Sequence, residues 1–275
     1  MKLPYEVLVQ GYFAESEVIV DWTSDVMKSN PETERLIKEA WSAREADARK
    51  NNQLLFPGTV YRLADWSEAS GTLNIVFGFT DYKDLVGTNL CHPEIAEEYG
   101  TEYLSNGTAA CSVVITADHK LVVQQRSDRV YEHPGKYHVC GGNLEPDEGG
   151  PKYLSPFSIM KRELWEELWI EPKYIADMHC LGLAKDRHTL KPEVIFETLL
   201  RVPADDIARG KGPEHKQLLL INESASELLE FLTSKIDQFV PVGLACLATY
   251  GQRRFGKQWY KAFLARLSNQ EKSGG

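Results

Sequence analysis

The segment from Gly141 to Ile170 constrains this chain more than any other, because it carries acidic side chains at a regular spacing. Glu163, Glu166 and Glu167 stand at positions i, i+3 and i+4, which share one face of an α-helix with Cβ atoms about 5–6 Å apart. Like charges this close repel one another unless a cation lies among them, and carboxylate oxygens suit Mg²⁺ or Mn²⁺. The segment therefore predicts a helix that holds a divalent metal, and such metals usually serve phosphate chemistry.

The same segment resembles the Nudix box, the signature of the Nudix hydrolase family. The residues that carry the resemblance, in the spacing or order of the box, are Gly142, Glu148, Arg162, Glu163, Glu166 and Glu167. Two departures stand out. Thirteen residues separate Glu148 from Arg162 where the family has seven, and Trp169 occupies the position of a family glycine. Because glycine usually provides the left-handed helix end, we expect this helix to end differently.

The resemblance also implies a fold. The expected class is α/β, a Nudix α/β/α sandwich with a mixed sheet, in which residues 106–275 form the Nudix hydrolase domain with C-terminal helices. Residues 1–105 are expected to form a smaller N-terminal α/β region, which is a candidate for specifying the substrate. Period and turn signals alone predict only a mixed α/β chain.

Apolar periodicity and turn residues predict the individual elements. Strands are expected at residues 5–13, 16–22, 61–64, 71–79, 109–116, 120–125, 137–140, 181–184, 194–201 and 217–221. Helices are expected at residues 31–50, 93–99, 155–168, 224–235, 241–250 and 258–267. Residues 65–70 are expected to be a polar connection. Ser155 followed by Pro156 is typical of a helix start.

Within the family resemblance, Glu163, Glu166 and Glu167 are the expected metal ligands, joined by the carbonyl oxygen of Gly141. The expected cofactor is Mg²⁺, with Mn²⁺ as the alternative. Arg162 is expected to reach back to Glu148 and to fix the loop against the helix, since a bidentate arginine–carboxylate pair suits that task. Gly142 and Glu148 are therefore predicted to be structural.

Hydrolysis of a diphosphate also needs a general base that positions the attacking water. Glu163 is one candidate, and Glu193 and Glu197, near the strand at residues 194–201, are two others. Glu214 is favoured slightly, because it lies in a loop just before a strand, where several family members keep an extra acid.

A narrower resemblance is carried by Trp41 and residues 54–56, 61–63 and 78–89, and further on by residues 181–184 and 212–214. These stretches are similar to animal Nudix hydrolases of UDP-glucose and UDP-galactose, which implies cleavage to UMP and hexose 1-phosphate. Tyr82, Thr88 and Asn89 are candidate substrate contacts, with a capped turn that joins two domains as the alternative, and Arg126 is a candidate phosphate contact. Hydrolysis of ADP-ribose, dinucleotides or coenzyme A diphosphates stays open. A Nudix-fold nucleotide-binding module without turnover is less favoured, because the box carboxylates are intact.

The overall composition narrows the partners. A net charge of −9 argues against nucleic-acid binding, which requires a basic face. The five cysteines are scattered and form no CxxC pair, so neither a zinc site nor a disulfide framework is expected. No apolar run is long enough to span a membrane, and we find no secretory signal. We expect a cytoplasmic protein whose partner is a small nucleotide-sugar.

Overall fold

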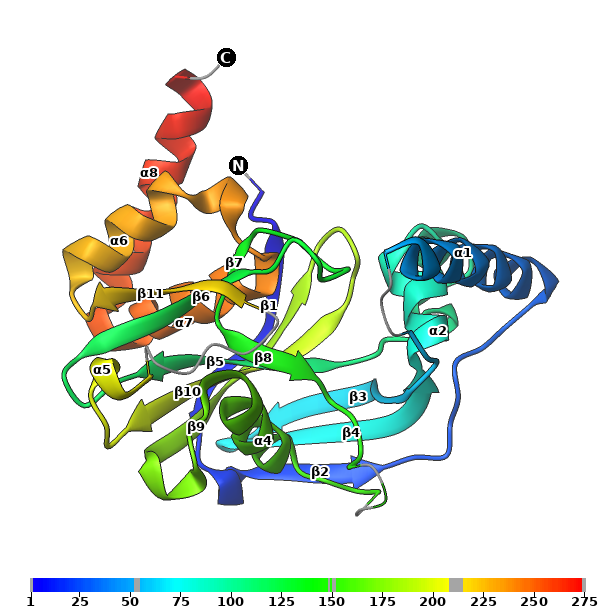
Figure 1. The fold of residues 1–275 in the computed structure, drawn as a ribbon, viewed down its shortest axis with the longest axis horizontal. Coiled ribbons are helices and arrows are strands. Elements are labelled where there is room, and N and C mark those ends of the chain that lie inside the picture. Colours follow the sequence, from blue (N-terminus) through cyan, green and yellow to red (C-terminus); the bar gives the residue numbers. More distant parts are fainter. Residues whose placement is uncertain (1, 52–54, 148, 150–151, 208–214, 274–275) are drawn as a thin grey trace.

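Alternating apolar residues build a central eight-stranded sheet in the computed structural model, which describes residues 2–51, 55–147, 149, 152–207 and 215–273 (Figure 1). Its strands are β1 (Tyr5–Phe13), β5 (Ala109–Ile115), β6 (Lys120–Arg126), β7 (Tyr137–His138), β8 (Cys140–Asn143), β9 (Ile175–Asp186), β10 (Pro192–Leu200) and β11 (His215–Asn222). The strand order is β1-β9-β10-β5-β6-β11, with β7 beside β6 and β8 beside β5. Strands β5 and β10 run parallel and the other pairs are antiparallel, so the sheet is mixed.

The two faces of this sheet support two separate hydrophobic cores. Along β5, Cys111 and Val113 enter one core, whereas Ala110 and Val114 enter the other, as the two-residue period of a strand requires. Helices α6 (Ala225–Ser234), α7 (Pro241–Phe255) and α8 (Lys257–Ser273) cover the first face. Helix α4 (Pro156–Leu168) covers the second (Figure 1). The expected α/β/α sandwich with a mixed sheet is confirmed.

A second, three-stranded sheet packs into the same core as α4. It consists of β2 (Val18–Trp22), β3 (Thr59–Ala69) and β4 (Thr72–Asp81), in the order β2-β4-β3. The predicted polar connection at residues 65–70 is wrong, because β3 continues to Ala69 after a register shift between Leu63 and Asp65. Trp66 packs against the core while its polar neighbours face outward. The polar residues on the exposed face of this strand therefore gave its sequence the character of a loop.

The remaining helical elements flank these sheets. They are α1 (Pro31–Lys50), α2 (Tyr82–Leu85), α3 (Ile95–Glu98), α5 (Ala204–Ile207) and single turns at Glu15–Glu17, Val86–Leu90, Thr101–Tyr103, Pro172–Tyr174 and Ile236–Gln238. Asn30 caps α1 by accepting the N–H groups of Glu32 at 3.0 Å and Thr33 at 2.9 Å. Strand β1 pairs with β9 and so belongs to the central sheet. The division of the chain at residue 105 stays a prediction.

The ends of α4 and α7 differ from expectation. Trp169 adopts the left-handed conformation (φ 60°, ψ 30°), and the N–H of Ile170 donates to the carbonyl of Leu164 at 3.1 Å. The predicted departure from a left-handed end is therefore wrong, because tryptophan occupies the conformation that glycine usually takes. Helix α7 continues through Gly251, where a Cβ atom would lie 2.3 Å from the Trp259 ring, and so needs glycine for packing.

Two further predictions concern the chain as a whole. All five cysteines are free thiols, four of them buried, as expected from their scattered positions. A search of the described helices finds none with the length and apolar character of a membrane span.

Candidate functional site

Helix α4 begins where the sequence predicts and turns two of its acids inward. The Ser155 hydroxyl accepts the N–H of Ser158 at 3.1 Å, and Pro156 occupies the first helical position. The residues that bury the core-facing side of the helix are Phe157, Ile159, Met160, Leu164 and Leu168. Glu163 and Glu167, one turn apart, are 8% and 7% exposed, whereas the Glu166 side chain is 57% exposed. Burial of two neighbouring acids is costly unless their charges are compensated.

The expected tight turn at Gly141 and Gly142 is wrong, because both residues lie in strand β8 and pair with β5. This part of β8 lies directly against the two acids. The N–H of Gly141 donates to Glu167 Oε2 at 2.9 Å, and the Gln124 amide donates to the same oxygen at 3.3 Å. A Cβ atom on Gly142 would lie 2.4 Å from Glu163 Oε2, so a side chain at that position would collide with the carboxylate. That carboxylate is the end of a flexible side chain and can shift, whereas a Cβ atom on Gly141 would lie 2.2 Å from the Ala110 carbonyl oxygen. The pairing of β8 with β5 therefore requires glycine at residue 141.

The charge of Glu163 is poorly compensated in this arrangement. Burial, followed by the carboxylates of Glu167 and Glu166, raises the pKa of Glu163 to about 8. The Arg162 guanidinium opposes this rise and lies 3.7 Å from Glu163 Oε1. Repulsion among the acids exceeds the help from the one arginine, so the acid face of α4 favours the arrival of a cation.

Arg162 joins the helix to the loop that follows β8. Its guanidinium forms an ion pair with Asp147, and both Nη atoms donate to the Glu145 carbonyl at 3.3 Å. The expected partner, Glu148, lies outside the described residues. Arg162 thus contacts the loop just before the expected residue, and its pairing with Glu148 stays a prediction.

A cavity of about 410 Å³ opens beside the box helix. Its lining includes Glu163, Glu166 and Glu167, the β8 residues Gly141 and Gly142, and Arg126. Other charged or titratable lining residues are Glu132, His133, His138, Glu145, Asp186, Lys191, Glu193 and His215. The tertiary fold therefore brings the predicted ligands together with residues from β6, β9, β10 and β11.

The general-base candidates separate in the structure. Glu193 lines the cavity at 7% exposure, and its Oε2 has no hydrogen-bond partner among the described residues. Burial, opposed by Lys191, raises the pKa of Glu193 to about 7. Glu197 is absent from the described cavity lining, and its carboxylate accepts from Arg253 Nε at 2.7 Å. Glu214 lies outside the described residues and stays a prediction.

The candidate substrate contacts also differ in their placement. Thr88 and Asn89 are fully buried, and Asn89 Oδ1 accepts the N–H of Asn106 at 2.8 Å. Tyr82 packs edge-on against Trp41 with ring centroids 6.5 Å apart. Among the described lining residues only Arg126 of this set is present, with its Nε donating to the Glu132 carbonyl. The contacts of Thr88 and Asn89 match the capped-turn alternative, and a substrate role for them stays a prediction.

Sequence reasoning missed three cavity residues in particular. Lys191 follows the β9–β10 turn, and His215 Nε2 lies 3.3 Å from Glu167 Oε1. The ring of His138 is buried, and burial with nearby cations lowers its pKa. None of these residues belongs to a motif with a recognisable spacing. Each reaches the cavity only through the pairing of strands that are distant in the sequence, so no local signal could identify it.

The oxygen donors of this site fit a hard divalent cation in their chemistry. Glu163, Glu166 and Glu167 supply carboxylates, and the mutual repulsion that raises the pKa of Glu163 is the kind that a cation relieves. Within the described ranges, however, no three His, Cys, Asp or Glu side chains converge closely enough to form a ready metal site. The identity of the metal ligands therefore stays a prediction.

Comparison with known proteins gives this cavity a family context. Residues 106–239, which contain β8 and α4, match the family model described as the NUDIX domain. The chain is 25% identical to Nudix hydrolase 9 from Arabidopsis thaliana over 234 residues, which cover 70% of this chain and 73% of that protein. It is 28% identical to a uridine diphosphate glucose pyrophosphatase from Mus musculus over 199 residues, which cover 66% of this chain and 60% of that protein.

A solved structure that resembles this fold is the MutT protein from Methanosarcina mazei Go1. It has a TM-score of 0.36 and 19% sequence identity, and the match covers 55% of this chain and 95% of that one. From the domain match and the box residues at the cavity, this chain belongs to the Nudix hydrolase family, whose members are pyrophosphohydrolases of nucleotide diphosphate compounds and generally use a divalent metal.

Proposed function

We propose that this protein is a Mg²⁺-dependent diphosphatase that converts UDP-glucose or UDP-galactose to UMP and hexose 1-phosphate. The observation that carries the proposal is the cavity of about 410 Å³ lined by Glu163, Glu166 and Glu167. Its volume suits a small ligand, and its acids suit a metal that binds phosphate. The similarity to the mouse uridine diphosphate glucose pyrophosphatase supports the choice of UDP-sugars.

The proposed reaction is a hydrolysis. The oxygen of a water molecule bonds to one phosphorus, the bridging P–O bond breaks, and the bridging oxygen leaves on the other phosphate. Glu163, Glu166, Glu167 and the Gly141 carbonyl would hold Mg²⁺, which neutralises diphosphate charge and lowers the pKa of water.

The other steps fall to the protein's own side chains. Arg162 holds the loop at residues 145–147 against α4 through its contacts with Glu145 and Asp147. A carboxylate must accept the proton that the water loses. Of the described candidates, Glu163 and Glu193 line the cavity.

A substrate panel tests the proposal. Purified protein is incubated with UDP-glucose, UDP-galactose, ADP-ribose, dinucleoside polyphosphates and coenzyme A, with Mg²⁺ or with EDTA. The release of UMP, of AMP or, from coenzyme A, of adenosine 3′,5′-bisphosphate is measured. We expect Mg²⁺-dependent UMP release from the UDP-hexoses. Turnover of ADP-ribose without turnover of UDP-hexoses would overturn the substrate assignment alone. Nucleotide binding without turnover of any compound would instead identify a binding module.

A further inference from the structure

The cavity contains a second group of charges, separate from the acids of α4, that surrounds Lys191. The Lys191 side chain is 8% exposed, and its Nζ donates to Glu132 Oε2 at 2.8 Å and to Asn143 Oδ1 at 3.1 Å. An ammonium has three N–H donors. Two acceptors among the described residues lie within hydrogen-bond distance of Nζ, which leaves one donor for the cavity that Lys191 lines.

The backbone around Lys191 is held firmly, so the ammonium is positioned before any ligand arrives. Asp186 Oδ1 accepts the N–H groups of His188 at 2.6 Å and Thr189 at 3.2 Å. The Asn89 amide, which comes from the N-terminal region, donates to the Thr189 carbonyl at 3.2 Å. Contacts from Asp186, at the start of this turn, and from Asn89 therefore fix the turn that carries Lys191.

Glu132 orients two cations toward the same cavity. Its carboxylate accepts from Lys191, and its carbonyl accepts from Arg126 Nε at 3.0 Å. Burial works to raise the pKa of Glu132, yet Lys191, helped by Arg126, outweighs burial and the pKa is lowered. The carboxylate therefore stays ionised, and it anchors Lys191 as a positioning residue.

A buried ammonium in an open cavity has a clear chemical preference. Lysine is a compact, strongly hydrated charge, so a free N–H inside a cavity favours an anionic oxygen. The acids of α4 lie on the other part of the lining, and they repel a diphosphate that has no metal. Lys191, with Arg126, is the described cationic part of the lining that can attract it.

We propose that Lys191 donates a hydrogen bond to an anionic oxygen of the bound diphosphate, with Glu132 and Asn143 as positioning residues. This inference rests on the proposed function and adds a substrate contact to it. It separates the cavity into an acid part, which holds the metal, and a cationic part, which holds the diphosphate directly.

The test is binding of inorganic pyrophosphate by calorimetry, measured once with EDTA and once with Ca²⁺, so that no turnover is needed. For Lys191→Met we expect at least about tenfold weaker binding than for the wild type, as expected for loss of a charge-assisted hydrogen bond. Lys185→Met is the matched control, since it removes the same charge from β9, where Lys185 Nζ lies 3.6 Å from Glu6. We expect unchanged affinity for this control.

A double variant separates a ligand contact from a structural ion pair. Removing Lys191 alone leaves Glu132 buried without its partner and can unfold the protein, whereas removing both charges is better tolerated. Glu132→Gln/Lys191→Met should therefore fold and still bind pyrophosphate at least about tenfold more weakly than the wild type. Wild-type affinity in the double variant would show that Lys191 serves only to neutralise Glu132, and would overturn the proposal.

Two further outcomes are decisive. An equal loss of pyrophosphate affinity in Lys185→Met would show that the loss in Lys191→Met results only from the change in net charge, and would overturn the proposal. Absence of pyrophosphate binding by the wild type, in both EDTA and Ca²⁺, would also overturn it. The substrate panel is scored separately, so failure of the proposed function, which is absence of turnover, is distinguishable from failure of this contact.

Discussion

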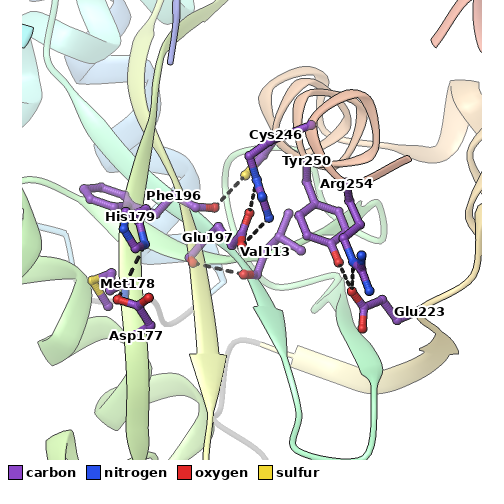
Figure 2. A network of polar contacts seen from close by, with 12 residues as sticks. Val113, Asp177, Met178, His179, Phe196, Glu197, Glu223, Cys246, Tyr250 and Arg254 are labelled. Atoms are coloured by element: carbon purple, nitrogen blue, oxygen red, sulfur yellow. Dashed lines mark hydrogen bonds and ion pairs between the residues drawn. The ribbon is translucent and has the colours of Figure 1, made fainter. Parts of the chain in front are cut away.

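Two groups of carboxylates differ in how their charges are compensated. On the α7 side of the sheet, Glu223 accepts from the Tyr250 hydroxyl at 2.6 Å and from Arg254 Nε at 2.6 Å (Figure 2). It also lies 2.7 Å from His119 Nδ1. In the cavity, burial followed by the acidic neighbours Glu167 and Glu166 raises the pKa of Glu163, and Glu193 Oε2 has no partner among the described residues.

The difference separates two uses of the same side chain. A carboxylate whose donors all come from the protein contributes to stability, because its desolvation is offset within the fold. A buried carboxylate beside other acids costs stability and is retained where a ligand or a cation completes it. Substitutions in the cavity should therefore lower turnover without lowering stability, whereas substitutions in the compensated group should lower stability without lowering turnover. Four predictions test this contrast.

The largest expected effect is in the cavity. Glu167→Gln or Glu166→Gln should lower Mg²⁺-dependent turnover by several orders of magnitude, because each removes a predicted metal ligand. The melting temperature should not fall, since glutamine keeps an acceptor for the Gly141 N–H and Glu163 loses a repulsive neighbour. The measurements are kcat on the best compound of the substrate panel and thermal unfolding. Turnover close to that of the wild type would place the metal elsewhere.

The matched substitution in the compensated group is Glu223→Gln. It should leave turnover unchanged and lower the free energy of unfolding by about 1–2 kcal/mol, because charge-assisted hydrogen bonds are lost. Urea denaturation measures this change. The exposed Glu230 provides a control, since Glu230→Gln should change stability by less than about 0.5 kcal/mol. A loss of turnover in Glu223→Gln with a normal unfolding curve would break the contrast.

The stabilising contribution of Glu223 should also depend on pH. Burial opposes the shift, but Arg254, Tyr250 and His119 together lower the pKa of Glu223 below its ordinary value of 4.5. This contribution is therefore present above pH 4.5 and is lost as the pH falls through the lower pKa of the folded state. The difference between the wild type and Glu223→Gln should shrink in acid.

Glu193 should show the reverse dependence on pH. Burial raises its pKa from the ordinary 4.5 to about 7, so the folded state keeps a proton that the unfolded state has lost. Stability therefore falls as the pH rises through this window. Glu193→Gln, which cannot ionise, should gain in melting temperature over the wild type between pH 5 and pH 8. If the melting temperatures of the two proteins changed in parallel with pH across that range, ionisation of Glu193 would not destabilise the fold, and the prediction would be wrong.

The smallest expected effect tests the end of α4. Trp169 holds a left-handed conformation at φ 60°, which costs a side-chain-bearing residue about 1–2 kcal/mol. Trp169→Gly should therefore stabilise the protein by about 0.5 kcal/mol, after the greater chain entropy of glycine and the lost contact with Trp165. Trp169→Ala loses the same ring but keeps the strain, so urea denaturation should place it below Trp169→Gly.

Local signals allowed much of the fold to be predicted from the sequence. The start of α4 at Ser155 and Pro156, as predicted, follows from hydrogen bonds within a few residues. The β3 extension and the continuation of α7 through Gly251 could not be predicted in this way. Both depend on packing against distant residues, such as the Trp259 ring beside Gly251.

The sequence by itself determined the acid spacing of α4, the glycines beside it and the family, because these are contained in one continuous segment. Only the tertiary structure decided which other groups share the cavity. Glu193 and Glu197 lie on one strand, yet one lines the cavity and the other is held by Arg253. Lys191 reaches Glu132 and Asn143 across 59 and 48 positions of the chain. Such encounters result from strand pairing and chain crossing, which no local pattern of residues encodes.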